Sequence, residues 1–593
     1  MSYQLNLPLE ELARDRGKLN TLRNMIAVVS AGIEKNAEIA ASTIEFTVNE
    51  FADILRENTP FDILSADSQN SKQISPYPFQ IFDLVQSEQR PKVFSTVKEL
   101  ANRLDLNAIK ESFVNTELIG IDESQVDIPL PQSNLSFLKS VAFRTYEMPN
   151  GSQYEQIGPV VSDMRIQLEE NDSFENANKL LGYIRNNFIA YISALTALPY
   201  GRKPFVILHG PLIRAIGGFT HIIFDYKDAH RLLNINLEDA GEFKPPPGNK
   251  QSVMKGDSFT KHNLSLVPEK ALDGEKNILE FNKFCINICD RKCGRYNEED
   301  GIFPKNARPK KSWTKDEIQR REYPGFCLYF WVLRSLFDLA RISEITIASV
   351  VEDVSAATEM TRLVLPSLLA KSNVREQVRN SALNTALKAI KLTLPKQQSR
   401  SDVYNKTKDI VKTLRLSDSN IFSFVLDEGQ YTAPVEIYRY RTRNDFIRAI
   451  DDRSWGTDNA LEPIFEKLFP TPQQLNSDSH PGYRVLMSYV RTTPLREPVR
   501  VEYFDLPHLK NDRHDRVIGP IYVLSLPYQE YGMPIILYYA DKMARTPTKI
   551  IRTVVEKEYL ELILQQRLNI NEPLTFMRLL GRLTRNYFQR EGM

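Results

Sequence analysis

The sequence predicts an α/β protein with one core assembled from distant segments. Apolar runs of strand length occur in both halves of the chain, at residues 118–121, 205–208 and 345–351. Stretches with the periodicity of helices separate these runs. Strands that alternate with helices along a chain are typical of the α/β class, in which helices cover the faces of a sheet.

Composition is that of a globular protein. The chain has 593 residues, of which 42% are hydrophobic and 25% are charged. This length corresponds to three or four ordinary domains or to one large elaborated domain. No apolar run approaches the ~20 residues that a membrane span needs, and the first residues lack the apolar segment of a secretory signal. We therefore expect a cytoplasmic protein that does not enter the membrane.

The charge balance excludes general attraction to nucleic acid. The formal net charge is only +1, so binding to DNA would depend on local basic patches. One candidate patch extends from Lys305 to Arg321 and contains Trp313, although a solvated loop is the simpler interpretation.

The first half of the chain is expected to begin with helices and continue into strands. A helical pattern occupies the first sixty residues and ends before Pro60. After a helix at 97–113, strands are expected at 118–121, 141–146 and 160–168, and a long helix at 174–198. The run FVIL at 205–208 is expected to form a buried strand that ends at His209.

Residues 237–322 differ in character from the segments around them. This stretch contains KPPPGNK and few long apolar runs, which favours a partly flexible insertion. It also contains Cys285, Cys289 and Cys293, which together with Cys327 would either bind a metal or remain reduced on a helix face.

The second half returns to regular patterns. A helix is expected at 326–340, a strand at 345–351 and mostly helices at 355–414. Residues 483–503 predict a hairpin with arms at 485–490 and 499–503. The run Ile535–Tyr539 is expected to form a strand that precedes a long final helical region.

Titratable residues at the ends of these elements suggest a metal site. Phosphodiester hydrolysis with two ions about 4 Å apart needs oxygen or nitrogen ligands from several elements. Asp122 follows the strand at 118–121, His209 ends the strand at 205–208, and Asp541 follows the run at 535–539. Glu175, near the start of the long helix, is a further candidate, and Glu169 is its rival.

Several segments together resemble the NurA family of DNA-repair nucleases. IGIDESQ at 119–125 is similar to the first family motif, in which Gly is usual where this chain has Glu123. FVILHGPLI at 205–213 resembles the second motif, with His209 in the place of Asp. Three later segments resemble the middle and the end of the family domain, namely 416–435, 489–505 and 531–546.

The resemblance implies a ribonuclease H-like mixed sheet flanked by helices. It also implies cleavage of DNA with manganese or magnesium, assembly into a homodimer and partnership with HerA, a hexameric DNA-translocating ATPase. By resemblance, Asp122 is a metal-binding acid, His209 occupies the position of another, and Tyr531 matches a family tyrosine. Asp541 lies where many members have histidine.

The domain division that follows has four parts. It comprises an N-terminal helical region at 1–115, the first part of the core at 116–236, the insertion at 237–322, and the second part of the core with C-terminal helices at 323–593.

Two departures from the family pattern leave two interpretations open. Loss of a carboxylate at His209 would turn the site into a DNA-binding or regulatory scaffold. Alternatively, His209 and Asp541 would form an altered ligand set, since neutral imidazole binds manganese and Asp541 restores the negative charge.

The remaining candidates are weaker. Glu502 and Asp225 are more often exposed or structural acids than ligands at such positions, and the helix expected at 576–590 would present a basic face to phosphate or to a partner. The sequence lacks a Walker-type glycine loop, so ATP-driven movement would require another chain.

Overall fold

The computed structural model describes the core of the chain. The described residues are 48–64, 78–84, 116–130, 133–148, 151–167, 172–198, 203–214, 222–225, 322–352, 357–381, 400–414, 416–436, 485–506 and 514–545, with a few short pieces elsewhere.

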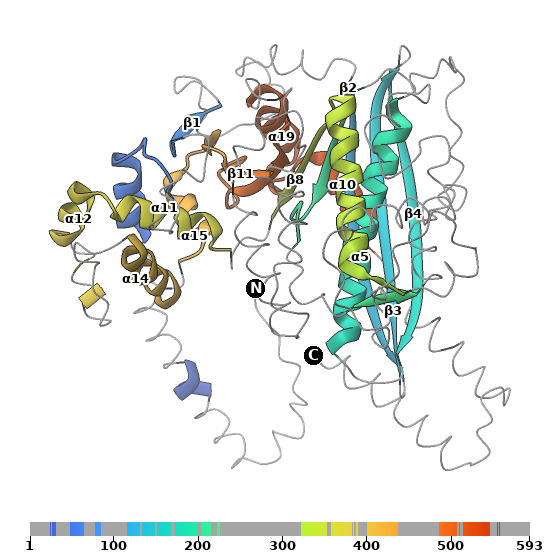
Figure 1. Cartoon of the computed structure of the whole chain (residues 1–593), viewed down its shortest axis with the longest axis horizontal. Helices are drawn as coiled ribbons and strands as arrows, with labels where there is room; N and C mark the ends of the chain where they lie inside the picture. Colours follow the sequence, from blue (N-terminus) through green and yellow to red (C-terminus); the bar gives the residue numbers. More distant parts are fainter. Residues whose placement is uncertain are drawn as a thin grey trace, which may run out of the picture.

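One mixed sheet organises the described part of the chain (Figure 1). The strands lie in the order β1-β9-β11-β12-β8-β5-β2-β3-β4, and β10 pairs with β11. Their bounds are β1 Ile81–Asp83, β2 Thr116–Leu130, β3 Ser133–Met148, β4 Gly151–Gln167, β5 Lys203–His209, β8 Thr346–Val351, β9 Gln430–Thr432, β10 Val435–Glu436, β11 Val485–Val490 and β12 Val499–Phe504. Two short strands, β6 Ile223–Asp225 and β7 Glu322–Pro324, pair separately.

Three neighbouring strands in the middle of this sheet are parallel. β5 pairs in parallel with β2 on one side and with β8 on the other, whereas the remaining pairs are antiparallel. The carboxyl ends of β2, β5 and β8 therefore point in the same direction. In α/β sheets this edge is where ligands commonly bind.

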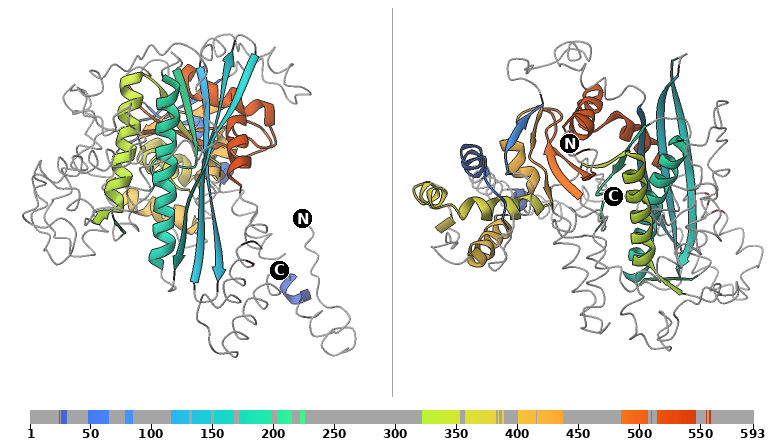
Figure 2. Two further views of the ribbon diagram at one scale, coloured as in Figure 1. Left: turned by 90° about the vertical axis from the view of Figure 1, so that its right-hand side faces the viewer. Right: turned by 45° about the horizontal axis from the view of Figure 1, so that its top comes forward.

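Helices cover both faces of the sheet (Figure 2). α5, Asp172–Ala197, packs against β2, β3 and the neighbouring helix α10, Gly325–Ser343. On the opposite face α20, Ile535–Ala544, lies across β2 and β3, near α19, Gly519–Ser525. This confirms the predicted α/β class with a mixed sheet between helices.

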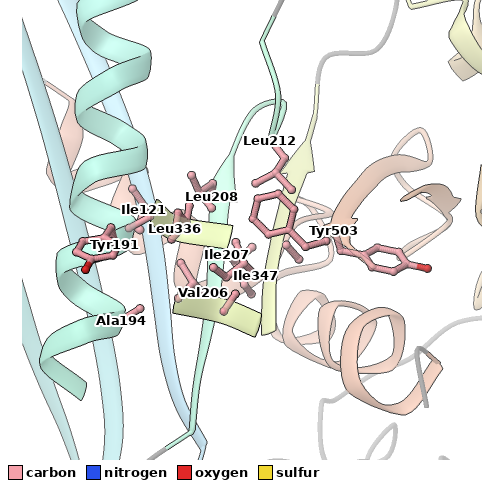
Figure 3. Close-up of a cluster of buried hydrophobic side chains, with 14 of the residues drawn as sticks. Ile121, Tyr191, Ala194, Val206, Ile207, Leu208, Leu212, Leu336, Ile347 and Tyr503 are labelled. Atoms are coloured by element: carbon pink, nitrogen blue, oxygen red, sulfur yellow. The ribbon is translucent and has the colours of Figure 1, made fainter. Parts of the chain in front are cut away.

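The main core lies between α5, α10 and the sheet (Figure 3). Side chains alternate along β2, so Ile119 and Ile121 share one face, and both are fully buried. They pair with Val206 and Leu208 of β5, and the buried Tyr191 of α5 belongs to the same cluster. Near-continuous apolar runs are expected of parallel strands that helices cover on both faces.

A buried ion pair lies within this core. Arg144 Nη1 of β3 is 3.1 Å from Glu117 Oε1 of β2, and both side chains are almost fully buried. Burying charges is costly unless they are paired, so each of these residues requires the other.

A second core forms beside the distal strands of the sheet, which Figure 1 shows at the left. We call it the helical lobe. It consists of residues 48–57, α11 Glu359–Leu369, α12 Ser372–Arg379, α14 Arg400–Thr413 and α15 Asp418–Val425. Asp418 ties the lobe to the sheet, because its carboxylate accepts hydrogen bonds from the N–H groups of Met360 and Thr361 and from the hydroxyl of Tyr489 on β11.

The described strands and helices confirm most expectations, but one expected strand is a helix. The predicted hairpin is present as β11 and β12. The expected strand at Ile535–Tyr539 is instead the first half of helix α20. Ile536, Leu537, Ala540 and Ala544 are its buried residues, and this spacing of three and four places them on one helix face.

Several predictions fall outside the described residues. They concern the insertion up to residue 321, its cysteines and basic patch, the helix at 97–113 and the C-terminal basic helix. The four-part domain division stays a prediction. Within the described residues, no helix combines the length and the apolar character needed to cross a membrane.

Candidate active site at the edge of the parallel strands

Side chains from β2, β5 and β8 share one face of the sheet at its carboxyl edge. Gly120 of β2 faces α20, because a Cβ atom there would lie 2.6 Å from the carbonyl oxygen of Ile536. Asp122, two residues later, lies on the same face. Gly120 pairs with Ile207, which places His209 on this face as well. His209 pairs with Val350 of β8, and Glu352 follows two residues later.

Asp122 lies at a corner of the sheet rather than at the tip of its strand. β2 pairs with β5 only up to Ile121 and then continues along β3 to Leu130. The expectation that the strand ends at Asp122 is therefore wrong. The neighbouring strand β5 ends at His209 instead, which leaves one side of β2 without a strand from Asp122 onward.

The central contact of the site joins Asp122 and His209. His209 Nδ1 lies 3.0 Å from Asp122 Oδ1, and the backbone N–H of Glu123 donates to the same oxygen at 2.8 Å. The Asp122 side chain is 7% exposed, and that of His209 is 25% exposed. The two predicted site residues from different motifs are thus in direct contact.

The electrostatic environment of His209 involves two more carboxylates. Burial by itself disfavours the charged imidazole. The hydrogen bond and the charge of Asp122 outweigh this effect, and together with the charges of Glu352 and Asp541 they raise the pKa of His209 above 6.5. His209 therefore holds a proton more firmly than an ordinary histidine does.

The same carboxylates affect the pKa of Tyr531. Burial raises the pKa of its hydroxyl well above 10, and the charges of Asp541, Glu352 and Asp122 raise it further. The hydroxyl is therefore neutral at physiological pH and can act as a hydrogen-bond donor. Tyr531 and Asp541 thus belong to the neighbourhood of the Asp122–His209 pair.

Asp541 is engaged by a cation one helical turn away. Its Oδ2 lies 2.7 Å from Arg545 Nη2, and Arg545 Nε donates to its Oδ1 at 3.0 Å. The Asp541 side chain is 14% exposed, whereas that of Arg545 is 62% exposed. The carboxylate is thus fixed on α20, and its partner remains accessible to solvent.

Ser124 of the first motif and Lys139 of β3 hold the end of α20 in place. Ser124 Oγ donates to the carbonyl of Ala544 at 2.5 Å, and Lys139 Nζ of β3 donates to the carbonyl of Met543 at 2.5 Å. The last carbonyls of a helix lack partners within the helix, and a lysine at this end also complements its dipole. These contacts position Asp541 relative to β2.

Other candidate residues have different surroundings. Glu175 is in the first turn of α5, but its side chain is not among those the structure describes, and Glu169 lies outside the described residues. The backbone of Asp225 ends β6, and nothing is described of its side chain. Glu502 is not the exposed strand acid that was expected: it is fully buried, pairs with Arg500 at 2.9 Å and accepts from the N–H of Leu212.

The donor chemistry of the site suits a hard divalent ion only in part. Carboxylate oxygens and imidazole nitrogen are ligands that manganese accepts. However, within the described part of the chain no three histidine, cysteine, aspartate or glutamate side chains converge with the geometry of a metal site. Asp122 and His209 contact each other, and Asp541 contacts Arg545. Metal binding would require these contacts to be exchanged.

Two residues near the site were missing from the sequence predictions. Glu352 follows the predicted strand at 345–351 directly, so the same rule that selected Asp122 would have found it. Arg214 lies five residues after His209, and its Nη2 is 3.4 Å from Glu123 Oε1. No periodicity or spacing in the sequence distinguishes this arginine from others.

The fold and site define an α/β protein with a polar site at the carboxyl edge of its parallel strands. The NurA domain matches residues 116–546, which is well over half of the 593 residues. The chain belongs to the NurA family. This confirms the resemblance that its motifs suggest.

The solved structures that match this chain include three of NurA. NurA with manganese is 10% identical, with a TM-score of 0.29, over 77% of this chain and 93% of that one. The NurA nuclease from Sulfolobus solfataricus is 8% identical, with a TM-score of 0.30, over 79% and 94%. NurA bound to dAMP and manganese is 11% identical, with a TM-score of 0.29, over 76% and 90%. No curated protein matches the chain.

Proposed function

We propose that this chain is a NurA-type nuclease that hydrolyses phosphodiester bonds of DNA at the Asp122–His209 site. The observation that carries the proposal is the meeting of Asp122 and His209, from the two family motifs, at the carboxyl edge of the sheet. Membership of the NurA family supports it. The role would be DNA end processing, in repair or in defence against foreign DNA.

Divalent manganese, or magnesium, is the proposed cofactor. Asp122, His209 and Asp541 would hold it, with Glu175 as the acid from α5. When bound, such an ion polarises the phosphate and lowers the pKa of a water molecule. His209 must first lose its proton, because only neutral imidazole coordinates a metal. The neutral hydroxyl of Tyr531 would donate a hydrogen bond to a phosphate oxygen.

A nucleic acid substrate suits the aromatic surface beside the site. Tyr528, Tyr531 and Tyr538 contact one another, with ring centroids 4.7–6.4 Å apart. Lys542 lies 5.2 Å from the ring of Tyr538, and 41% of Tyr528 is exposed. Exposed aromatic rings next to cations are typical of surfaces on which unpaired bases stack.

The test is cleavage of labelled linear and single-stranded DNA with manganese. The wild type should degrade it, whereas Asp122→Ala should be inactive. Asp53→Ala, which removes an exposed acid from the helical lobe, is the matched control and should leave cleavage unchanged. Cleavage that persists in Asp122→Ala would show that the bond is broken elsewhere.

A second candidate function is a DNA-binding or regulatory subunit that does not cut. It is favoured by the replacement of the family Asp by His209, whose imidazole is engaged by Asp122. In that case the wild type would be inactive with manganese, both alone and with its translocase, yet would still bind DNA. The variant His209→Asp, which restores the family residue, should then gain activity.

The proposed partners are a second copy of this chain and a HerA-type hexameric translocase. The proposal rests on family membership and on the lack of a Walker-type loop in this sequence. Sedimentation of the purified protein should show a dimer. Mixing with such an ATPase should give a larger complex that degrades DNA faster when ATP is hydrolysed. Separate sedimentation of the two proteins would contradict the partnership.

A further inference from the structure

A cavity of about 250 Å³ opens between β2, β3 and α5. Its lining includes three cationic side chains, Lys139, Lys179 and Arg214, together with Glu123 and Tyr183. Glu123 follows Asp122 in β2, so the cavity lies on the α5 face of this strand and the Asp122–His209 pair lies on the other face. The two regions meet at the edge of β2 beyond Ile121, where its pairing with β5 has ended. Lys139 Nζ is hydrogen-bonded to the carbonyl of Met543 on α20, whereas Arg214 remains partly exposed and is suited to an anion.

Arg214 is held in this cavity by contacts on several sides. Its Nη2 lies 3.4 Å from Glu123 Oε1, and its guanidinium carbon lies 4.6 Å from the centroid of the Tyr183 ring. Its backbone N–H donates to the hydroxyl of Tyr329 at 2.9 Å. The side chain remains 23% exposed. An arginine fixed in this way loses little entropy when it binds a ligand.

The turn after His209 creates the space for this arginine. Gly210 has φ +84°, a conformation that other residues seldom adopt. A Cβ atom at this position would lie 2.5 Å from Arg214 Nη2. The motif segment at 205–213, which contains His209 and Gly210, therefore determines where Arg214 lies as well as where the imidazole lies.

The contact with Glu123 leaves the guanidinium group able to bind another anion. At 3.4 Å the two charges are paired through one nitrogen of arginine. An arginine can present a fork of two parallel N–H groups, which matches two oxygens of a phosphate. A DNA phosphate could therefore replace the carboxylate or share the arginine with it.

We propose that Arg214 binds a backbone phosphate of the DNA strand next to the one at the Asp122–His209 site, and that Glu123 holds the arginine in position until DNA arrives. Arg214 is thus a binding residue for the substrate strand, and Glu123 is its positioning residue and competitor. This proposal rests on the proposed function only in requiring that DNA is the ligand.

The test measures binding of a labelled single-stranded oligonucleotide by fluorescence anisotropy in EDTA, so that no cleavage occurs. Arg214→Gln should weaken binding about tenfold, as expected for the loss of one charge-assisted hydrogen-bonded pair. It should also reduce the slope of log K against log salt by about 0.7 for each lost contact. Arg214→Lys should fall between the wild type and Arg214→Gln.

Two further variants separate this role from general charge or folding effects. Lys412→Gln removes an exposed cation from α14 in the helical lobe and should leave binding unchanged. Glu123→Gln removes the competing charge but keeps the size of the side chain, and it should strengthen binding severalfold. Unchanged or weaker binding in Glu123→Gln would overturn the proposal even if Arg214→Gln fails to fold.

Neutral methylphosphonate linkages locate the phosphate. Replacing one linkage at a time should weaken wild-type binding at a particular position, and that penalty should vanish in Arg214→Gln. Equal penalties in both proteins at every position would overturn the proposal. Because binding is measured without metal, an inactive protein that still shows this pattern would refute the nuclease function and leave the Arg214 site standing. Wild-type protein that does not bind DNA would overturn both.

Discussion

Asp122 Oδ1 and His209 Nδ1 lie 3.0 Å apart where β5 ends beside β2. The carboxylate oxygen also accepts the N–H of Glu123. By resemblance of 205–213 to the family motif, the imidazole stands in the position of an Asp, and two acids in contact there would repel each other. This difference affects both the stability of the site and its affinity for metal.

The substitution His209→Asp should lower the stability of the metal-free protein and raise its affinity for metal. Two carboxylates in contact destabilise the protein without metal, because their charges repel. A divalent ion would remove that repulsion, so manganese should raise the melting temperature more in the variant than in the wild type. Differential scanning fluorimetry with and without manganese measures both effects. An equal shift in the two proteins would contradict the assignment of this position as a ligand.

The pH dependence of stability should report on the same pair. The pKa of His209 is raised in the folded protein, so the folded state binds more protons than the unfolded state between 6.5 and the raised value. The contribution of the pair is full below pH 6.5 and is lost as the pH rises through the folded pKa. Urea unfolding of the wild type and His209→Gln should show a stability difference that shrinks as the pH rises. A stability difference between the two proteins that grows as the pH rises would contradict a raised pKa of His209 in the folded state.

Cleavage should show the opposite pH dependence if His209 is a metal ligand. Protons compete with metal for the imidazole, so activity at limiting manganese should increase as the pH rises through the raised pKa of His209. The profile for His209→Asp should be displaced to lower pH, and saturating manganese should reduce the displacement. If the pH–activity profiles of the wild type and His209→Asp coincide, His209 is not a metal ligand.

Removing one partner of the buried pair Glu117–Arg144 should be strongly destabilising. Glu117→Ala removes the carboxylate beside a guanidinium whose side chain is 1% exposed, which costs about 3–5 kcal/mol. The double variant Glu117→Leu with Arg144→Met should recover much of the loss, since no buried charge then remains. Urea unfolding measures the free energy of unfolding of the wild type, of Glu117→Ala and of the double variant. A single variant as stable as the wild type would contradict the burial of this pair.

Gly120→Ala should displace α20 from the sheet. The new methyl group would lie 2.6 Å from the carbonyl oxygen of Ile536, which belongs to the helix backbone and cannot rotate away. We expect a loss of about 1–3 kcal/mol and lower nuclease activity, because Asp541 and Tyr531 would move. Gly182→Ala is the matched control, since its methyl group would meet side chains alone, Glu123 at 3.2 Å and Leu138 at 3.9 Å. Equal stability in the two variants would argue against close packing of α20.

The sequence predicted most of the strands and helices because their apolar patterns are unambiguous. The run at 205–208 and the hairpin at 485–503 have the length and content of buried strands, and both are present. The run at 535–539 was wrongly predicted as a strand, since five apolar residues fit either structure. Spacing over the longer segment to Ala544, with Pro534 before it, would have favoured the helix.

The site could be predicted only where a motif marks it. Asp122 and His209 each follow an apolar run within a family motif, and the structure brings them together. Glu352 has no motif, and Arg214 depends on how a turn packs against Tyr183. Glu502 resembles an exposed strand acid in sequence, yet Arg500 two residues earlier makes its burial possible. Such tertiary partners are not visible in a linear pattern.

Ser124 illustrates how a motif residue can be essential without taking part in chemistry. A hydroxyl two residues after Asp122 could be taken for a nucleophile from the sequence alone. Its bond to Ala544 instead fastens the strand that carries Asp122 to the helix that carries Asp541. Ser124 therefore links β2, which carries Asp122, to α20, which carries Asp541, although these two parts of the site lie more than four hundred residues apart in the chain.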